Sequence, residues 1–107
     1  MTKTGSAWKL KLRYGKTKTK FQHYSTLAEG IAGNLVEGFT CPTGNAFMGM
    51  KVWASSTEEA GDMARAIGKQ IGFTFTGDIQ IYDTQPTQPP GEHPRAYDIN
   101  FTPFVEE

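Results

Sequence analysis

Titratable side chains gather around the most proline-rich stretch of the chain, Gln85 to Pro94. General acid and base catalysis needs paired groups whose surroundings give them separate pKa values, and carboxylates near a histidine or tyrosine can provide them. Eleven acidic residues in a chain of 107 also produce such clusters by chance, and an incidental polar cluster is the favoured interpretation. The residues that could form a polar pocket here are Tyr82, Asp83, Glu92, His93, Tyr97 and Asp98.

Soft metal ligands and nucleophiles are scarce. His23, His93 and Cys41 are the only ones, and no two of them lie at a recognised ligand spacing. A nucleophilic cysteine would need the fold to bring a histidine and an orienting carboxylate to it, and Cys41 before Pro42 is more typical of a small residue in a turn. Neither common glycine pattern of phosphate-binding loops occurs. The sequence therefore predicts no catalytic residue, no metal site and no cofactor.

Positive charge is concentrated at the beginning of the chain. Residues 1 to 24 hold seven bases and no acid, whereas the rest holds four bases and all eleven acids, so a neutral chain divides into parts at +7 and −7. The bases that could contact a partner are Lys9, Lys11, Arg13, Lys16, Lys18 and Lys20.

Three uses of this charge remain open. The favoured one is a solubilising strand whose lysines discourage edge-to-edge aggregation. The second is an acidic protein partner, or pairing with the acidic remainder of the same chain. The third is a nucleic acid, whose phosphates release counterions when they meet cations. It ranks last because Trp8 and Tyr14 fall on the face opposite the cations, and single-strand binders usually need exposed aromatic side chains for stacking.

Alternation of apolar and polar residues predicts most of the strands. Residues 8–14 alternate strictly and predict a half-buried strand, and a second extended stretch is expected around residues 21–27. Four glycines make residues 27–46 hard to interpret; short strands joined by turns are expected, with Pro42–Asn45 as the clearest turn. Residues 47–54 are apolar on both faces, with Met48, Met50 and Val52 on one of them, which indicates an interior strand.

A helix is expected at about residues 57–71. Ser56 and Glu59 have the spacing of a capping box, in which each side chain bonds the other residue's amide, and Gly72 suits the position after the last turn. One face carries apolar residues at helical spacing: Ala60, Met63, Ala64, Ile67 and Ile71.

The remaining chain predicts strands around a rigid loop. Residues 73–82 are either one long strand with a bulge at Gly77 or a tight hairpin. Four prolines exclude helix and central strand from residues 85–94. In the last strand, Tyr97, Ile99 and Phe101 alternate with polar residues and are expected on one face.

These elements together predict one α+β domain over residues 1–107, with a mostly antiparallel sheet of four to six strands and one main helix packed on a face. No apolar run approaches the length of a membrane span, and no apolar segment of a secretory signal follows the N-terminus. We therefore expect a cytoplasmic protein without membrane contact.

The stretch from Ile71 to Phe104 resembles small bacterial proteins of toxin-immunity systems. It combines a strand bounded by glycine, a Tyr-Asp-Thr sequence, a proline loop and a closing Tyr-x-Ile-x-Phe strand. The resemblance covers about a third of the chain and transfers no residue role. It implies a stoichiometric inhibitor that blocks a partner's active site by shape and charge.

The functional expectation is a non-catalytic protein-binding module, such as an immunity or antitoxin-like inhibitor of a bacterial toxin. The alternative is a nucleic-acid-binding domain that uses the basic N-terminal strand. A small enzyme with a site near the proline loop is the least favoured class.

Overall fold

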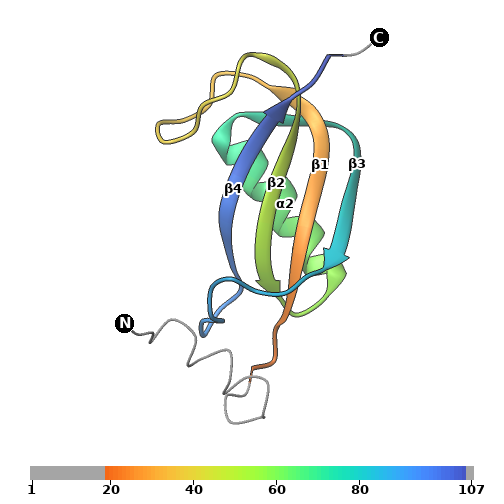
Figure 1. Ribbon diagram of the computed structural model, residues 1–107, viewed down its shortest axis with the longest axis vertical. Helices are drawn as coiled ribbons and strands as arrows, with labels where there is room; N and C mark the ends of the chain where they lie inside the picture. The colour runs from red at the N-terminus through yellow and green to blue at the C-terminus, as the bar shows by residue number, and fades with distance from the viewer. Residues whose placement is uncertain (1–18, 106–107) are drawn as a thin grey trace.

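The computed structural model describes residues 19–105, which form one antiparallel sheet with a helix packed on one of its faces (Figure 1). The strand predicted at residues 8–14 lies outside the described residues. The elements are β1 (Gln22–Ala32), β2 (Gly44–Ala54), α2 (Thr57–Ile71), β3 (Phe73–Asp83) and β4 (Arg95–Pro103). The strand order is β3-β1-β2-β4, so β2 is an interior strand, as its two apolar faces predict. The α+β class is confirmed.

The helix has the predicted bounds. The Ser56 hydroxyl accepts a hydrogen bond from the Glu59 amide at 3.1 Å, and Gly72 takes a left-handed conformation with φ of 115° at the C-terminal end. The other half of the capping box differs from the prediction, because the Glu59 carboxylate accepts from the amide and hydroxyl of Ser55, at 2.7 and 2.9 Å, instead of the amide of Ser56.

Two helix glycines have opposite surroundings, which gives a first prediction. A Cβ at Gly61 would make ordinary contacts at 3.5 Å or more, so we expect Gly61→Ala to raise the free energy of unfolding by about 1 kcal/mol through helix propensity. A Cβ at Gly68 would lie 2.7 Å from the ring of Phe75, so we expect Gly68→Ala to lower it by about 1 kcal/mol through overpacking. Urea unfolding of both variants tests this, and equal shifts in the same direction would contradict it.

The core lies between α2 and the sheet. Met48 and Val52 are fully buried there, and Met63 and Ile67 of the helix pack against the same cluster, so the predicted helix face is confirmed. Its buried members are Tyr24, Ala28, Ala32, Ala46, Met48, Met50, Val52, Ala54, Ala60, Ala64 and Phe73.

Strand β1 is longer than predicted. It continues through Gly30 to Ala32, and the short strands expected between residues 27 and 46 are replaced by this extension and a loop over residues 33–43. The loop turns at Glu37 and Gly38, whereas Gly44 and Asn45 already belong to β2, so the turn predicted at Pro42–Asn45 is wrong. Gly30 is required inside the strand because the ring of Phe73 and the carbonyl of Thr74 fill the space of a side chain.

Both edge strands contain an irregularity. Residues 73–83 form one long strand with a bulge, the first of the two predicted possibilities: Ala28 pairs with Ile79 and Gly30 with Phe75, which leaves extra residues on β3 around Gly77. In β4 the register shifts where Asp98 has a φ of +52°.

The bulge at Asp98 changes which way the side chains of β4 point. Ile99 and Phe101 pack against the helix-side core, whereas Tyr97 is buried in a separate cluster with Phe21 and Trp53. The predicted common face for Tyr97, Ile99 and Phe101 is therefore wrong, because simple alternation does not survive a bulge.

The face of the sheet opposite α2, here called the open face, points toward the viewer in Figure 1. The proline loop, residues 84–94, joins β3 to β4 across one end of this face (Figure 1). Between residues 19 and 105, no helix is long and apolar enough to cross a membrane.

Candidate functional site

Large apolar side chains remain exposed on the open face. Leu27 and Ile31 of β1 and Tyr82 of β3 are 36%, 41% and 50% exposed. They alternate with the buried helix-side residues of their strands, such as Ala28 and Ala32, which places them on the side of the sheet opposite α2.

A hollow of about 270 Å³ lies beside Leu27 and Tyr82, whereas Ile31 lies farther along β1, beyond Glu29. It forms over the middle of β2 because Gly49 has no side chain, and a Cβ there would lie 3.0 Å from the Asn100 amide group. An ion pair closes one side, with Lys51 Nζ 3.2 Å from Asp98 Oδ2. The described lining comprises Ser25, Thr26, Leu27, Gly49, Met50, Lys51, Tyr82, Asp98 and Asn100.

At the end of the open face, hydrogen bonds hold the proline loop to the sheet. The Trp53 indole donates to the Gln88 carbonyl at 2.8 Å. The Arg95 guanidinium donates to the Pro89 carbonyl at 2.9 Å and to Gln88 Oε1 at 2.6 Å. The Tyr97 oxygen accepts from the amides of Thr87 and Gln88 at 3.0 and 3.3 Å. The loop that the prolines predict is therefore fixed by side chains from β2 and β4.

His23 connects this network to β1. Its Nε2 lies 2.5 Å from the Tyr97 oxygen, and its Nδ1 lies 3.0 Å from the Thr84 carbonyl oxygen. His23 is 7% exposed, and its ring packs edge-on against the Trp53 ring at a centroid distance of 5.1 Å. Burial lowers the pKa of His23 from its ordinary value of 6.5; the hydrogen bond with Thr84 opposes this, and the charge of Lys51 lowers the pKa further.

The six residues predicted for a polar pocket are divided among three places. Tyr82 and Asp98 line the hollow, and Tyr97 is buried in the loop network. Asp83, Glu92 and His93 are exposed, and the His93 imidazole has no hydrogen bond or ion pair with any described residue. The histidine that meets Tyr97 is instead His23, a pairing that the sequence did not suggest because 74 positions separate the two residues.

Of the six predicted basic contact residues, only Lys20 is among the described residues. Lys9, Lys11, Arg13, Lys16 and Lys18 lie outside the described residues. Lys20 is exposed at the start of the described chain, with its ammonium 5.4 Å from the centre of the Phe21 ring. The use of this charge stays a prediction.

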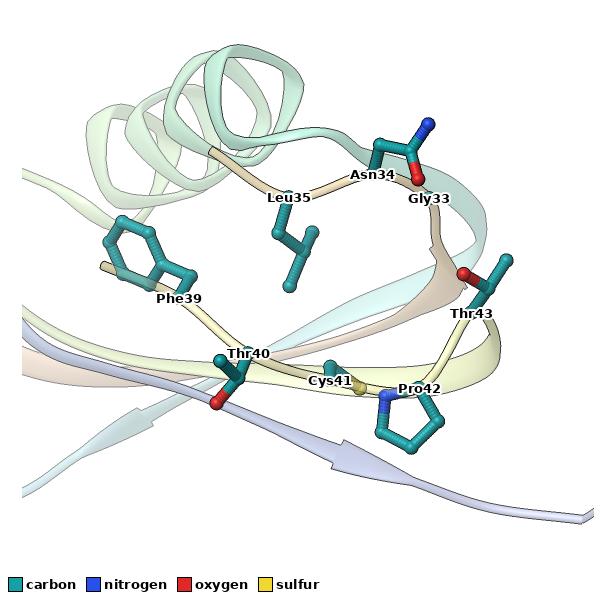
Figure 2. A pocket seen from close by; sticks show the side chains of 8 residues that line it. All are labelled: Gly33, Asn34, Leu35, Phe39, Thr40, Cys41, Pro42 and Thr43. Atoms are coloured by element: carbon teal, nitrogen blue, oxygen red, sulfur yellow. The ribbon is translucent and has the colours of Figure 1, made fainter. Parts of the chain in front are cut away.

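A second pocket, of about 510 Å³ and open to solvent, is lined by the loop at residues 33–43 (Figure 2). Figure 2 shows Leu35 pointing into this space and Cys41 among its lining residues. Among residues 19–105, neither a histidine nor a carboxylate lines it, so none of them places a base for nucleophilic chemistry beside the thiol. Within residues 19–105, no three histidine, cysteine or acidic residues lie close enough together to hold a metal ion.

No family model, curated protein or solved structure matches the chain. What the open face and the loop network can do follows from their own geometry. On the open face, exposed Leu27 and Tyr82 lie beside the hollow, and the Lys51–Asp98 ion pair and Asn100 lie at its border.

The burial of His23 predicts a pH dependence of stability. Between about pH 6.5 and its lower folded pKa, the unfolded chain binds more protons at this residue than the folded chain, so the free energy of unfolding should fall as the pH falls. Each unit between the two pKa values corresponds to about 1.4 kcal/mol. Urea unfolding at a series of pH values measures this change in the free energy of unfolding.

Replacing each of the two histidines in turn shows which one causes the pH dependence of stability. His23→Gln should remove the loss of stability below pH 6.5, and His93→Gln, at an exposed position, should leave it in place. An unchanged pH dependence in His23→Gln would contradict the assignment to His23.

Proposed function

We propose that the chain is a non-catalytic protein-binding module whose binding surface is the open face of the sheet. The observation that carries the proposal is that the exposed side chains of Leu27 and Tyr82 both line the hollow over Gly49 on this face. A partner's apolar side chain would enter the hollow. Leu27 and Tyr82 would form the buried centre of the contact, and the Lys51–Asp98 pair and Asn100 its polar border.

The segregation of charge along the chain supports a partner with a basic surface. Residues 25–107 hold eleven acids and four bases, whereas residues 1–24 hold seven bases and no acid. Complementary charge would mainly increase the rate of association and the specificity of the pairing.

An immunity-type inhibitor of a bacterial toxin is the most concrete form of this proposal. The resemblance of residues 71–104 to proteins of toxin-immunity systems supports it, and so does the surplus of acids in residues 25–107 if the toxin is a basic nuclease. The order of genes tests this form separately: a toxin-like reading frame beside the gene is expected, and its absence would leave only the general binding module.

Affinity capture from the source cells tests the binding surface. Full-length tagged chain, Leu27→Asp and Tyr82→Asp are compared with Val36→Asp, a matched control because Val36 is 46% exposed but lies in the loop at residues 33–43. Replacing exposed strand residues in this way costs about 1 kcal/mol of stability, so the variants should fold, which circular dichroism verifies.

We expect one protein to be recovered with the unmodified chain and with Val36→Asp, and to be lost with both open-face variants. Recovery of the same proteins with all four chains would place the binding surface elsewhere and overturn the proposal.

A further inference from the structure

The Tyr97 oxygen determines where the proton lies in the loop network. It accepts hydrogen bonds from the amides of Thr87 and Gln88, which use both of its lone pairs. Its own hydrogen must therefore be donated, and His23 Nε2 at 2.5 Å is a much closer acceptor than the Thr87 hydroxyl at 3.5 Å. This arrangement requires Nε2 to carry no proton.

The other ring nitrogen has the opposite requirement. The Thr84 carbonyl oxygen, 3.0 Å from His23 Nδ1, can only accept, so Nδ1 carries the hydrogen. The Thr84 hydroxyl lies 3.1 Å from the same nitrogen and 2.8 Å from the Ser25 hydroxyl, to which it can donate. His23 is thus held from both sides as the neutral tautomer protonated on Nδ1.

Protonation of Nε2 would place two hydrogen-bond donors, the Nε2–H of His23 and the O–H of Tyr97, opposite each other. The tyrosine would have to turn its hydrogen away, which requires it to give up one of the two loop amides, because its oxygen can accept only two hydrogen bonds. The Tyr97–Thr87–Gln88 contact is therefore compatible with neutral His23 and incompatible with charged His23.

The charged groups around His23 do not stabilise its protonated form. From β2, Lys51 brings a positive charge, and from β4, Arg95 lies over the Tyr97 ring at 5.5 Å. Asp98 of β4 is paired with Lys51, and Asp83 of β3 is exposed. The proline-loop groups in contact with the ring or with Tyr97, those of Thr84, Thr87 and Gln88, are uncharged.

We propose that His23, Tyr97 and the proline loop form an acid-sensitive latch: neutral His23 holds Tyr97 where it anchors the loop, and protonated His23 releases it. The loop borders the open face, so the latch would also regulate partner binding, and only this last step rests on the proposed function. The lowered pKa of His23 places the release on the acid side of its ordinary range.

Nuclear magnetic resonance on the full chain tests the latch without a partner. Long-range ¹⁵N–¹H spectra give the tautomer and the titration midpoint of His23, and hydrogen exchange gives the protection of the Thr87 and Gln88 amides. The His93→Gln background removes the second imidazole of the chain. We expect the Nδ1–H tautomer at pH 7.5, a midpoint below 6.5, and loss of amide protection with the same midpoint.

Two variants complete the test. Tyr97→Phe should leave the Thr87 and Gln88 amides unprotected at every pH, and His23→Gln, whose side chain does not titrate, should abolish the pH response of these amides. If one of the two variants does not fold, the other still shows whether the protection of these amides depends on His23 and Tyr97. An Nε2–H tautomer at pH 7.5, or amide protection unchanged across the His23 midpoint, would overturn the latch. Neither result would affect the capture experiment on Leu27 and Tyr82.

Discussion

Replacement of Gly30 with alanine should lower the free energy of unfolding by about 3 kcal/mol, the upper end of the usual cost of overpacking. A Cβ at this position would lie 2.2 Å from the Thr74 carbonyl oxygen and 2.7 Å from two ring atoms of Phe73. The backbone of β3 would have to move, because the nearest atom belongs to the main chain of a paired strand. Urea unfolding followed by circular dichroism measures the effect.

Gly91→Ala is the matched control for this substitution. Gly91 lies in the proline loop, and a Cβ there would be 3.5 Å from its nearest neighbour, the Arg95 side chain. Its stability should stay within about 0.5 kcal/mol of the unmodified chain. A Gly30→Ala chain that unfolds at the same urea concentration as Gly91→Ala would show that β1 and β3 do not approach as closely as described.

Replacement of Met48 with a smaller residue should lower the free energy of unfolding by a similar amount, but by leaving a cavity instead of overpacking the core. Its side chain is fully buried between the sheet and α2, so Met48→Ala should leave a cavity and lower the free energy of unfolding by about 3 kcal/mol. Met48→Leu keeps most of the volume and should cost less than about 1.5 kcal/mol. Calorimetric or urea unfolding of the pair tests this, and equal losses in both variants would contradict a tightly packed site.

Local signals explain why the helix could be predicted from sequence. Ser56, the acidic first turn and Gly72 act within a few residues of the helix ends, and the apolar spacing of Ala60 to Ile71 needs only one face of contact. The interior position of β2 is equally predictable from sequence, because apolar residues on both faces of a strand indicate that it has neighbours on both sides.

Long-range contacts explain what the sequence did not reveal. Gly30 looks like a strand breaker until the Phe73 ring, 43 residues away, is seen to occupy its side-chain space. The bulge at Asp98 reverses the expected side of Tyr97, and the alternating pattern around it gives no sign of this. These effects arise from pairing between strands, which a single sequence does not specify.

The candidate site was recognised only in part for the same reason. Tyr82 and Asp98 were among the predicted site residues, but as members of a titratable cluster with His93, and the hollow that joins them depends on Gly49 of another strand. A glycine at the centre of an otherwise apolar interior strand was the available signal for that hollow. The partnership of His23 with Tyr97 had no local signal.

The binding affinity of the captured partner tests the central claim most directly. Isothermal titration of that purified partner with the unmodified chain, Leu27→Asp and Val36→Asp gives three dissociation constants. A residue at the buried centre of an interface contributes about 2 kcal/mol or more, so Leu27→Asp should weaken binding at least about 30-fold. Val36→Asp should change it less than about twofold, because a change away from the interface has little effect. Equal dissociation constants for Leu27→Asp and the unmodified chain would contradict binding through the open face.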